Sequence, residues 1–539
     1  MLVSSYQLVE RKGGNRHQKF LFGPGGEAEA DAYITSQLEA HSSPMGKPDR
    51  AKMGRRRALG VGGGCWLRER NAQIISPHME SPAGGFMGEL LKDAAERAAR
   101  YLSSVSERGV APRPEDVARL SGLGGPMPDG PMEPAHVLAM LDEIGSPATV
   151  ASAGPRYFGF VIGGSLPATL AANWLAGAWD QDAALGVMSP LAAAVEEIAR
   201  VWLCELLGLP ASCGVGFVTG ATMANFACLA AARHALLSRA AWNVEEDGLF
   251  GAPPLTVVVG DEVHVSLLKA LSMLGLGRSR VVRVPADAQG RMRAGALPAL
   301  DERTIVCIQA GNVNTGAFDP AEDICSRAQA AGAWVHVDGA FGLWAAVAPE
   351  RAQLMNGFAR ADSWATDCHK WLNVPYDSGL AFVRDAEQLR SAMAVSAAYL
   401  QSTGAREPWH YTPESSRRAR GVEVWAALRS LGKRGLAEMI EGHCRMASRF
   451  AEILRGAGYA VPNDVVLNQV LVLFGGREAA KRVIQEVQNE GTCWCGGTEW
   501  HGQAAMRISV SNWSTTPEDV DRSAAAILRI ANRVNGRGA

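Results

Sequence analysis

The sequence has no long apolar run, no excess of either charge and few cysteines. No apolar stretch reaches the roughly 18–20 residues needed to span a bilayer. Lys and Arg number 53 against 55 Asp and Glu, a formal net charge of −2, so nothing favours nucleic acid or an anionic membrane surface as a partner. The ten cysteines are scattered, which excludes a dense disulfide framework. We therefore expect a soluble, cytoplasmic protein without nucleic-acid or membrane partners.

The composition is that of a globular protein with a large core. Hydrophobic residues make up 47% and charged residues 20% of the 539 residues, which is long enough for two or three domains. Residues 1–81 differ, because they are polar, Gly-rich and Arg-rich, with little helical or alternating period. We predict a disordered extension or a mis-assigned start codon there. An export signal is the alternative for MGRRRALGVGGGCWL, but this patch begins only at Met53 and is broken by glycines.

Ordered structure is predicted from about Pro82. Residues 86–106 and 135–144 have helical patterns, separated by the Gly/Pro-rich segment 120–134. A further helix starts at Ser189-Pro190, with proline in its first turn.

Between residues 214 and 384, short apolar runs alternate with helical segments. Most of the runs are continuous and β-branched, as expected for strands that helices bury on both faces. This alternation predicts an open, mostly parallel α/β sheet, in which ligands bind at the carboxyl ends of the strands. The predicted strands are 214–220, 255–260, 280–284, 304–311, 333–340, 363–366 and 379–383. Two later runs, 465–474 and 505–512, indicate a smaller α+β domain at the C-terminus.

The polar residues that follow these strands suggest a cofactor site. The first strand ends in Thr219-Gly220-Ala221-Thr222 and leads into a helix, where small residues and the helix N-terminus favour a phosphate. An ordinary N-cap is the alternative for this turn. Gly214 and Gly216 lie inside the strand, so they are no dinucleotide fingerprint.

Three further residues complete this set. His264 follows the second strand, and its alternative is a loop or capping role. Asp338 ends an apolar strand, where a carboxylate is costly without a partner; it could also be an N-cap or a metal ligand. Lys370 follows the next strand in apolar surroundings. A phosphate-binding turn, a flat histidine ring, a buried carboxylate and a desolvated lysine are together the parts that hold pyridoxal phosphate (PLP).

The motifs carrying these residues closely resemble group II PLP-dependent decarboxylases, which include aromatic L-amino acid, histidine and glutamate decarboxylases. They are DEVHVSLLKA, QAGNVNTGAFDP, HVDGAFGLW and DSWATDCHKWLNVPYDSGLAFVR, in this order, and the resemblance runs from about Glu89 to the C-terminus. It implies the fold of type I PLP-dependent transferases, with a mostly parallel seven-stranded sheet. The large PLP-binding domain would span 186–398. A mobile loop and a small C-terminal α+β domain would span 399–539, and the helical segment 82–185 would contribute to a homodimer.

The resemblance also assigns site residues. It implies that Lys370 forms the Schiff base, that Asp338 partners the pyridine nitrogen and that His264 stacks on the ring. The rest of the cofactor site would be Gly220, Ala221, Thr222, Asn312, Ala340 and His369. Three positions depart from the family pattern without removing a required group, and these are Met223, Cys368 and Ser378.

The implied reaction is decarboxylation of an L-amino acid to the amine and CO2. Tyr411, on the loop after the lysine, would protonate Cα, or else it only packs there. Phe158 and Phe160 would line the substrate pocket, with core packing as the alternative. Because no arginine can be tied to a substrate side-chain carboxylate, we expect an aromatic or other uncharged amino acid rather than glutamate.

The cofactor residues leave other functions open. The same fold could run an aminotransferase, an aldehyde-forming deaminase or another lyase, and a non-catalytic PLP-binding protein is a more remote alternative. Cys493, Cys495 and His501 fall short of the usual four-ligand zinc spacing, so we predict no metal site.

Overall fold

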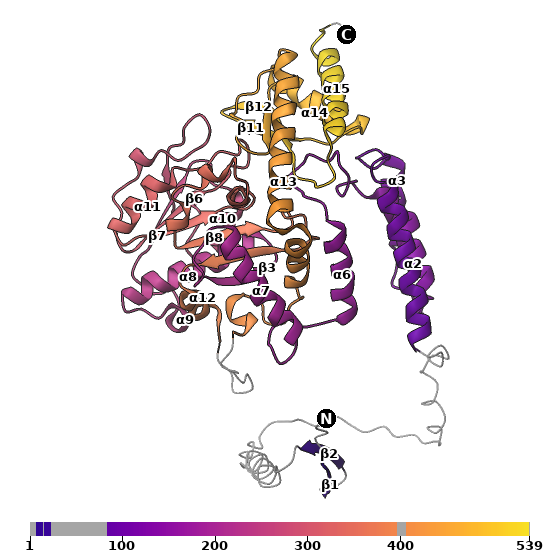
Figure 1. Ribbon diagram of the computed structural model, residues 1–539, viewed down its shortest axis with the longest axis vertical. Coiled ribbons are helices and arrows are strands. Elements are labelled where there is room, and N and C mark those ends of the chain that lie inside the picture. Colours follow the sequence, from indigo (N-terminus) through magenta and orange to yellow (C-terminus); the bar gives the residue numbers. More distant parts are fainter. Residues whose placement is uncertain (1–6, 14–15, 23–82, 396–405, 538–539) are drawn as a thin grey trace, which may run out of the picture. The chain divides into compact units, whose positions relative to one another are not determined.

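The computed structural model describes residues 7–13, 16–22, 83–395 and 406–537, and it divides into two units, Met1–Glu80 and Ser81–Ala539 (Figure 1). In the first unit, β1 (Gln7–Gly13) and β2 (Arg16–Phe22) form an antiparallel pair. The other residues of the predicted N-terminal extension lie outside the described residues, and so does 396–405 of the predicted loop.

The second unit contains the predicted sheet. Each of the seven apolar runs forms a strand, in the spatial order β3-β9-β8-β7-β6-β4-β5. Only β9 is antiparallel to its neighbours; the other paired strands are parallel, which confirms the predicted fold class. The strands are β3 (Gly214–Val218), β4 (Thr256–Gly260), β5 (Val282–Val284), β6 (Thr304–Gln309), β7 (Trp334–Asp338), β8 (Ser363–Asp367) and β9 (Gly379–Val383).

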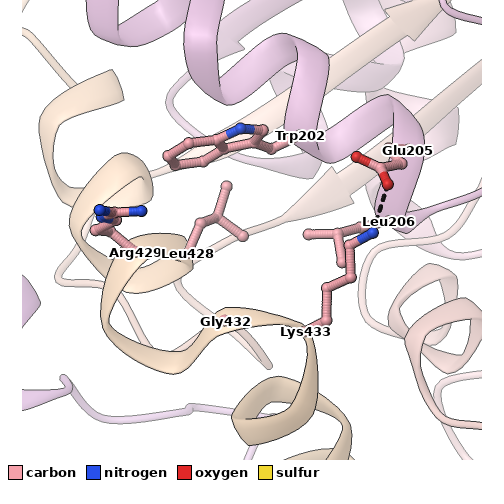
Figure 2. Close-up of a pocket in the computed structure, with 7 residues that line it drawn as sticks. All are labelled: Trp202, Glu205, Leu206, Leu428, Arg429, Gly432 and Lys433. Atoms are coloured by element: carbon pink, nitrogen blue, oxygen red, sulfur yellow. Dashed lines mark hydrogen bonds and ion pairs between the residues drawn. The ribbon is translucent and has the colours of Figure 1, made fainter.

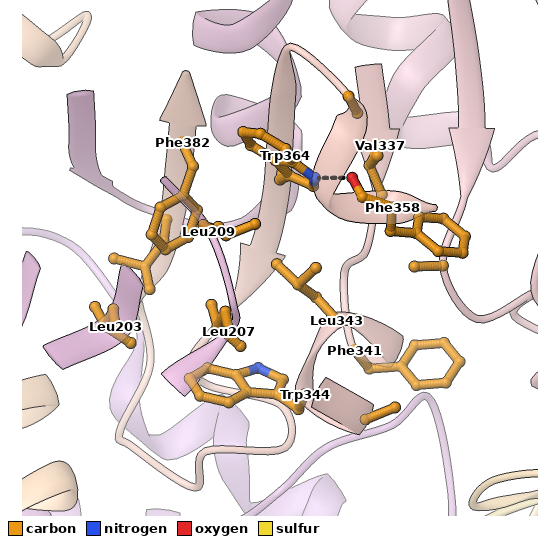
Figure 3. Close-up of a cluster of buried hydrophobic side chains, with 14 of the residues drawn as sticks. Leu203, Leu207, Leu209, Val337, Phe341, Leu343, Trp344, Phe358, Trp364 and Phe382 are labelled. Atoms are coloured by element: carbon orange, nitrogen blue, oxygen red, sulfur yellow. Dashed lines mark hydrogen bonds between the residues drawn. The ribbon is translucent and has the colours of Figure 1, made fainter. Parts of the chain in front are cut away.

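Both faces of this sheet are buried. On one face, side chains of α8 (Ala221–Arg239), α10 (Val265–Met273) and α12 (Ala386–Met393) pack against alternate strand residues. On the other face, Trp364 and Phe382 pack with Trp344 and with leucines at the end of α7 (Pro190–Leu206) (Figure 3). Burial on both faces explains why the strands read as continuous apolar runs.

Helices precede and connect these strands. Proline occupies the first turn of α6 (Pro167–Trp179) and of α7, where its missing N–H costs nothing. The other helical elements before the C-terminal region are α2 (Ala83–Ser104), α3 (Pro114–Ala118), η2 (Arg119–Leu123), α4 (Pro134–Met140), η3 (Leu141–Gly145), α5 (Ser146–Ala148), α9 (Val244–Asp247), η4 (Ala294–Ala296), α11 (Ala321–Ala330), η5 (Gly342–Val347), η6 (Ala352–Met355) and η7 (Phe358–Arg360). None of the helices in the described part of the chain is long and apolar enough to cross a membrane.

The C-terminal region is built on one long helix, α13 (Gly421–Gly456), which runs from the large sheet to a small one (Figure 1). The small sheet has the antiparallel order β10-β12-β11. Its strands and helices are β10 (Gln469–Val472), α14 (Arg477–Glu490), β11 (Gly496–Trp500), β12 (Gln503–Ser509) and α15 (Pro517–Val534). The predicted α+β domain is thus present, and β11 is a strand that sequence reasoning missed.

A kink in α13 opens a small groove. Gly432 has non-helical torsions there (φ 60°, ψ −178°). The groove lies between α13 and α7, and Trp202 and Leu428 form part of its wall (Figure 2). Its charged residues include an ion pair between Glu205 and Lys433, both largely exposed. The charges of this pair are therefore solvated.

The described part of the segment predicted as a mobile loop is tied to the large domain. Arg417 forms an ion pair with Glu196 of α7 at 2.7 Å, and both side chains are buried. Tyr411 is the last residue of η8 (Pro408–Tyr411), and the guanidinium of Arg406 lies over its ring, 4.5 Å from the ring centroid. These contacts hold residues 406–421 beside β3 and α7.

Candidate active site

The predicted site residues meet where parallel strands end. Asp338 is the last residue of β7, and Lys370 follows the end of the neighbouring β8. Together with His264 and Ala340 they line one cavity of about 250 Å³. The other lining residues are Phe160, Val161, Gln309, Gly311, Val313, Phe341 and Arg507. The convergence follows from the fold, because parallel strands present their carboxyl ends at one edge of the sheet.

Asp338 is a buried carboxylate with neutral partners. One oxygen accepts the backbone N–H of Ala340 at 3.2 Å, and the other accepts the side-chain amide N–H of Asn225 at 3.2 Å. Asn225 lies one turn inside α8 and is itself fully buried. Hydrogen bonds to a carboxylate compensate its desolvation, so Asp338 is held in place without a cation of its own.

A chain of hydrogen bonds extends behind Asn225, and its direction can be assigned. The Trp334 indole N–H donates to the Ser363 hydroxyl (2.9 Å), which in turn donates to Nδ1 of His336 (2.9 Å). Nε2–H of His336 then donates to the Asn225 amide oxygen at 2.9 Å. Burial lowers the pKa of His336 to about 3, so the ring is neutral and carries its one proton on Nε2. Every donor in the chain points toward Asp338.

The alternation of side chains along a β-strand explains this chain of hydrogen bonds. Trp334, His336 and Asp338 alternate along β7 and therefore share one face, the face that α8 covers. Ser363 on β8 pairs in register with His336. The strand thus supplies both the carboxylate and two members of the hydrogen-bond chain.

Lys370 is paired with a second carboxylate, that of Asp367. The Lys370 ammonium lies 2.8 Å from Asp367 Oδ2. Asp367 is the last residue of β8, and its Oδ1 accepts the backbone N–H of Ala221, the first residue of α8, at 2.5 Å. One buried carboxylate therefore joins Lys370 to the helix start that was predicted to bind phosphate.

The turn before α8 is closely packed. A Cβ added to Gly220 would come within 2.9 Å of the His369 ring and 3.0 Å of Asp367 Oδ1, so only glycine fits. His369 Nδ1 accepts the Ser378 N–H, and its Nε2 lies 3.4 Å from Asp367 Oδ1. Burial lowers the pKa of His369. Gly220, Ala221 and His369 thus surround the same helix start, with Thr222 following in its first turn.

His264 combines the two roles weighed for it. It is the N-cap of α10, where its Nδ1 accepts the backbone N–H of Ser266 at 3.3 Å. The same ring lines the cavity with Lys370 and Asp338. Burial lowers the pKa of His264, and the nearby Lys370 adds to this effect. Capping fixes the proton of the neutral ring on Nε2.

Six predicted site residues lie outside the cavity lining, and they are Gly220, Ala221, Thr222 and His369 around the start of α8, together with Asn312 and Tyr411. Asn312 is buried, and its side-chain oxygen accepts the backbone N–H groups of Asn314 and Thr315, so it shapes the turn behind Gly311. Tyr411 packs against the hydrophobic cluster on the α8 face of the sheet. The structure does not bring the side chain of Asn312 or Tyr411 together with Lys370 in this chain.

The two phenylalanines separate. Phe158 is buried in the C-terminal domain, edge-on to Phe450 with ring centroids 5.0 Å apart, which is the core-packing alternative. Phe160 lines the cavity instead. Phe160 and Val161 both have left-handed backbone torsions (φ 54° and 58°), which is rare for a β-branched valine. This turn separates the two phenylalanine side chains.

Arg507, on β12, is a cavity residue that sequence reasoning missed. Its guanidinium donates to the Val313 carbonyl oxygen at 3.3 Å. Within the described part of the chain, no carboxylate lies within ion-pair distance of it, and burial lowers its pKa. The signal in the sequence was a charged residue inside the apolar run AMRISVSN. Asn225 and Asp367 were missed as well, since their roles depend on spatial neighbours.

The residues present fit PLP. Asp338 can face a pyridine nitrogen, Lys370 can reach an aldehyde carbon, and the amides around Gly220 can face a phosphate. The glycine cradle, which a Cβ would fill, is a space of the kind that a close backbone–ligand approach needs. Among the described residues, no cluster of three or more metal-ligating side chains occurs, and Cys493 and Cys495 are buried in the C-terminal core.

The comparison with known families supports this assignment. Residues 130–474 match the pyridoxal-dependent decarboxylase conserved domain, which is well over half of the chain.

Individual relatives give the same picture. The chain is 27% identical over 417 residues to tryptophan decarboxylase 1 of Oryza sativa subsp. japonica, covering 70% of this chain and 80% of that protein. It is 26% identical over 360 residues to phenylacetaldehyde synthase of Petunia hybrida, covering 61% of this chain and 68% of the relative. The fold is similar to the crystal structure of Oryza sativa TDC with PLP and tryptamine, with a TM-score of 0.77 and 23% identity over 84% of this chain and 99% of that one.

Proposed function

The chain belongs to the pyridoxal-dependent decarboxylase family, and on this premise we propose that it decarboxylates an L-amino acid with an aromatic or other uncharged side chain. PLP is the cofactor, and the enzyme is an amino acid carboxy-lyase. The observation that carries the proposal is the convergence of Lys370, Asp338 and His264 in one cavity.

The positions of these residues support the roles that we propose for them. Bound PLP supplies an electron sink for the electron pair released when the bond between Cα and the carboxylate breaks. Lys370 would hold the cofactor through its amine, and Asp338 would keep the ring nitrogen protonated. The His264 ring, fixed by its N-cap bond, would lie against the cofactor. Phe341, which is buried, would exclude water from the reacting carbon.

The side-chain preference rests on the cavity lining. Phe160, Val161, Val313 and Phe341 are apolar and support an aromatic or aliphatic substrate. Arg507 favours a second candidate, a substrate with an acidic side chain, because a buried guanidinium without a carboxylate partner suits a carboxylate ligand. Arg507→Gln separates the two: it should raise KM strongly for an acidic substrate and only slightly for an uncharged one.

A panel of L-amino acids tests the reaction. The purified protein, loaded with PLP, is incubated with each amino acid, and released CO2 and the amine product are both measured. We expect CO2 and amine in equal amounts, and neither product from Lys370→Ala, which should also lack the visible absorbance band of lysine-bound PLP. An aldehyde or keto acid without the matching amine would instead indicate a deaminase or aminotransferase.

We also propose that the enzyme is a cytoplasmic homodimer. Side chains on α6 and α7 leave an apolar face exposed, and they are Trp174, Leu175, Trp179, Leu191, Ile198 and Val201. A second copy is the expected occupant of such a face. The nine cysteines of the described residues are buried and unpaired, which supports a reducing compartment. Sedimentation of the purified protein tests the dimer.

A further inference from the structure

The helix start that the cofactor phosphate needs already bears a carboxylate. Asp367 Oδ1 accepts the Ala221 N–H at 2.5 Å, and Ala221 is the first residue of the 19-residue helix α8. A helix N-terminus favours an anion because its first amides lack intrahelical acceptors. A phosphate at this turn would therefore meet a second negative group on the same donor.

Asp367 cannot easily leave this position. Its side chain is 3% exposed, and Oδ2 is 2.8 Å from the Lys370 ammonium. Its backbone N–H donates to the Ala340 carbonyl oxygen, and its own carbonyl accepts the Trp344 indole N–H at 3.1 Å. The backbone on both sides is thus fixed by β8 and by the segment after β7, so the carboxylate stays at the helix start.

We propose that Asp367 is an internal anion that shares the α8 N-terminus with the cofactor phosphate. It stabilises the cofactor-free protein, since it satisfies the Ala221 N–H and pairs with Lys370. It weakens the phosphate end of PLP binding, since two negative groups repel at short range. The protein consequently gives up PLP more readily than one with a neutral residue at this position.

This inference rests on the proposed PLP-dependent function of the site, but its test needs no substrate. The dissociation constants of PLP and of pyridoxal, which lacks the phosphate, are measured from the visible band of the lysine-bound form. The ratio of the two constants isolates the phosphate end, because any change in the reactivity of Lys370 affects both ligands alike.

The main variant is Asp367→Asn, which keeps an oxygen for the Ala221 N–H and removes the charge. We expect PLP to bind at least about tenfold more tightly relative to pyridoxal. The melting temperature of the cofactor-free variant should fall, because the ion pair with Lys370 is lost. Asp367→Ser, whose hydroxyl can also accept the amide, carries the same expectation and is the second variant if the first does not fold.

The matched control is Asp362→Asn. Asp362 lies at the opposite end of β8, where its Oδ2 accepts the Val335 N–H at 2.8 Å, and the ratio of constants should not change in this variant. The proposal would be overturned if, in both Asp367 variants, the affinity for PLP relative to that for pyridoxal is unchanged or lower than in the wild-type protein. Failure of PLP to bind the wild-type protein would instead overturn the PLP-dependent function, so the two failures are distinguishable.

Discussion

Asp338 and Asp367 end neighbouring parallel strands, yet the two ends of the proposed cofactor site differ in their charges. Both carboxylates are buried at the same edge of the sheet. Asp338 has only neutral partners, whereas Asp367 faces the ammonium of Lys370. The same residue type at equivalent strand positions thus gives two different electrostatic environments.

The difference shows what a buried carboxylate needs in order to act on a ligand. At the ring end, hydrogen bonds from Ala340 and Asn225 stabilise the charge of Asp338 without cancelling it, so it can still attract a protonated ring nitrogen. At the phosphate end, the charge of Asp367 is balanced by Lys370. The neutral partners of Asp338 thus leave its charge free to attract a cation, whereas Asp367 already has a cationic partner in the cofactor-free protein.

Asp338→Asn should have the largest effect, because it removes the charge at the ring end. We expect kcat to fall by roughly 10²–10³-fold, the range for loss of one preorganised electrostatic group. The visible band should persist, since Lys370 is intact. Steady-state kinetics and absorbance of the loaded variant measure both.

The comparison is sharpest when Asp338→Asn is assayed beside Asp367→Asn. The first should damage turnover and the second should tighten PLP binding, although both substitutions are chemically identical. If both variants lose turnover to the same extent, the two ends are not distinct in the way proposed.

The sequence predicted which residues end the strands, but not which residues from other segments line the cavity with them. Continuous apolar runs follow directly from burial of the sheet on both faces, so the positions of Asp338 and Lys370 at strand ends could be deduced from the chain alone. Arg507 could not be deduced in this way, and Phe160 was expected at the pocket only from the family resemblance, since both residues come from segments far from these strands in the sequence. Their approach depends on the docking of the C-terminal domain and on a left-handed turn.

Local patterns also failed where geometry decides between roles. Phe158 and Phe160 read alike, but Phe158 lies in the core, and Phe160, in a turn with left-handed torsions, lines the cavity. Asn312 was placed at the cofactor by resemblance; its oxygen accepts backbone amides of its own turn, and its role at the cofactor stays a prediction. The strand β11 has the sequence GGTEW, in which only the first and last residues are buried.

Asn225→Ala should have an intermediate effect on the ring end. It removes the N–H that Asp338 accepts and the acceptor for His336, so the carboxylate loses its orientation. We expect kcat to fall roughly tenfold, as for loss of one hydrogen bond to a charged group. A shift in the pH midpoint of the visible band, which mere destabilisation would not cause, is the diagnostic measurement.

Ser363→Ala is the graded control for that experiment. It removes the hydroxyl that links Trp334 to His336. His336 is itself two hydrogen bonds away from Asp338. Its effect on kcat should be smaller than that of Asn225→Ala. An equal or larger loss would mean that the chain does not transmit orientation along its length.

His336→Gln should have the smallest effect at neutral pH. It tests whether the hydrogen-bond chain behind Asp338 is uncharged. Burial lowers the pKa of His336 from 6.5 to about 3. Between these two values the unfolded chain binds a proton that the folded chain does not. The wild-type protein therefore loses up to about 1.4 kcal/mol of unfolding free energy per pH unit as the pH falls from 6.5 toward 3.

Glutamine can form hydrogen bonds with both Asn225 and Ser363 but does not titrate. The variant should therefore lack this part of the loss of unfolding free energy at acidic pH. Urea unfolding at a series of pH values measures the difference between the two proteins, in which the contributions of all other groups cancel. His443, buried with its pKa lowered to about 4, provides the parallel substitution away from Asp338. If the unfolding free energy of the wild-type protein has the same pH slope as that of His336→Gln, His336 is charged in the folded protein. The ring end would then contain a cation, just as the phosphate end contains Lys370.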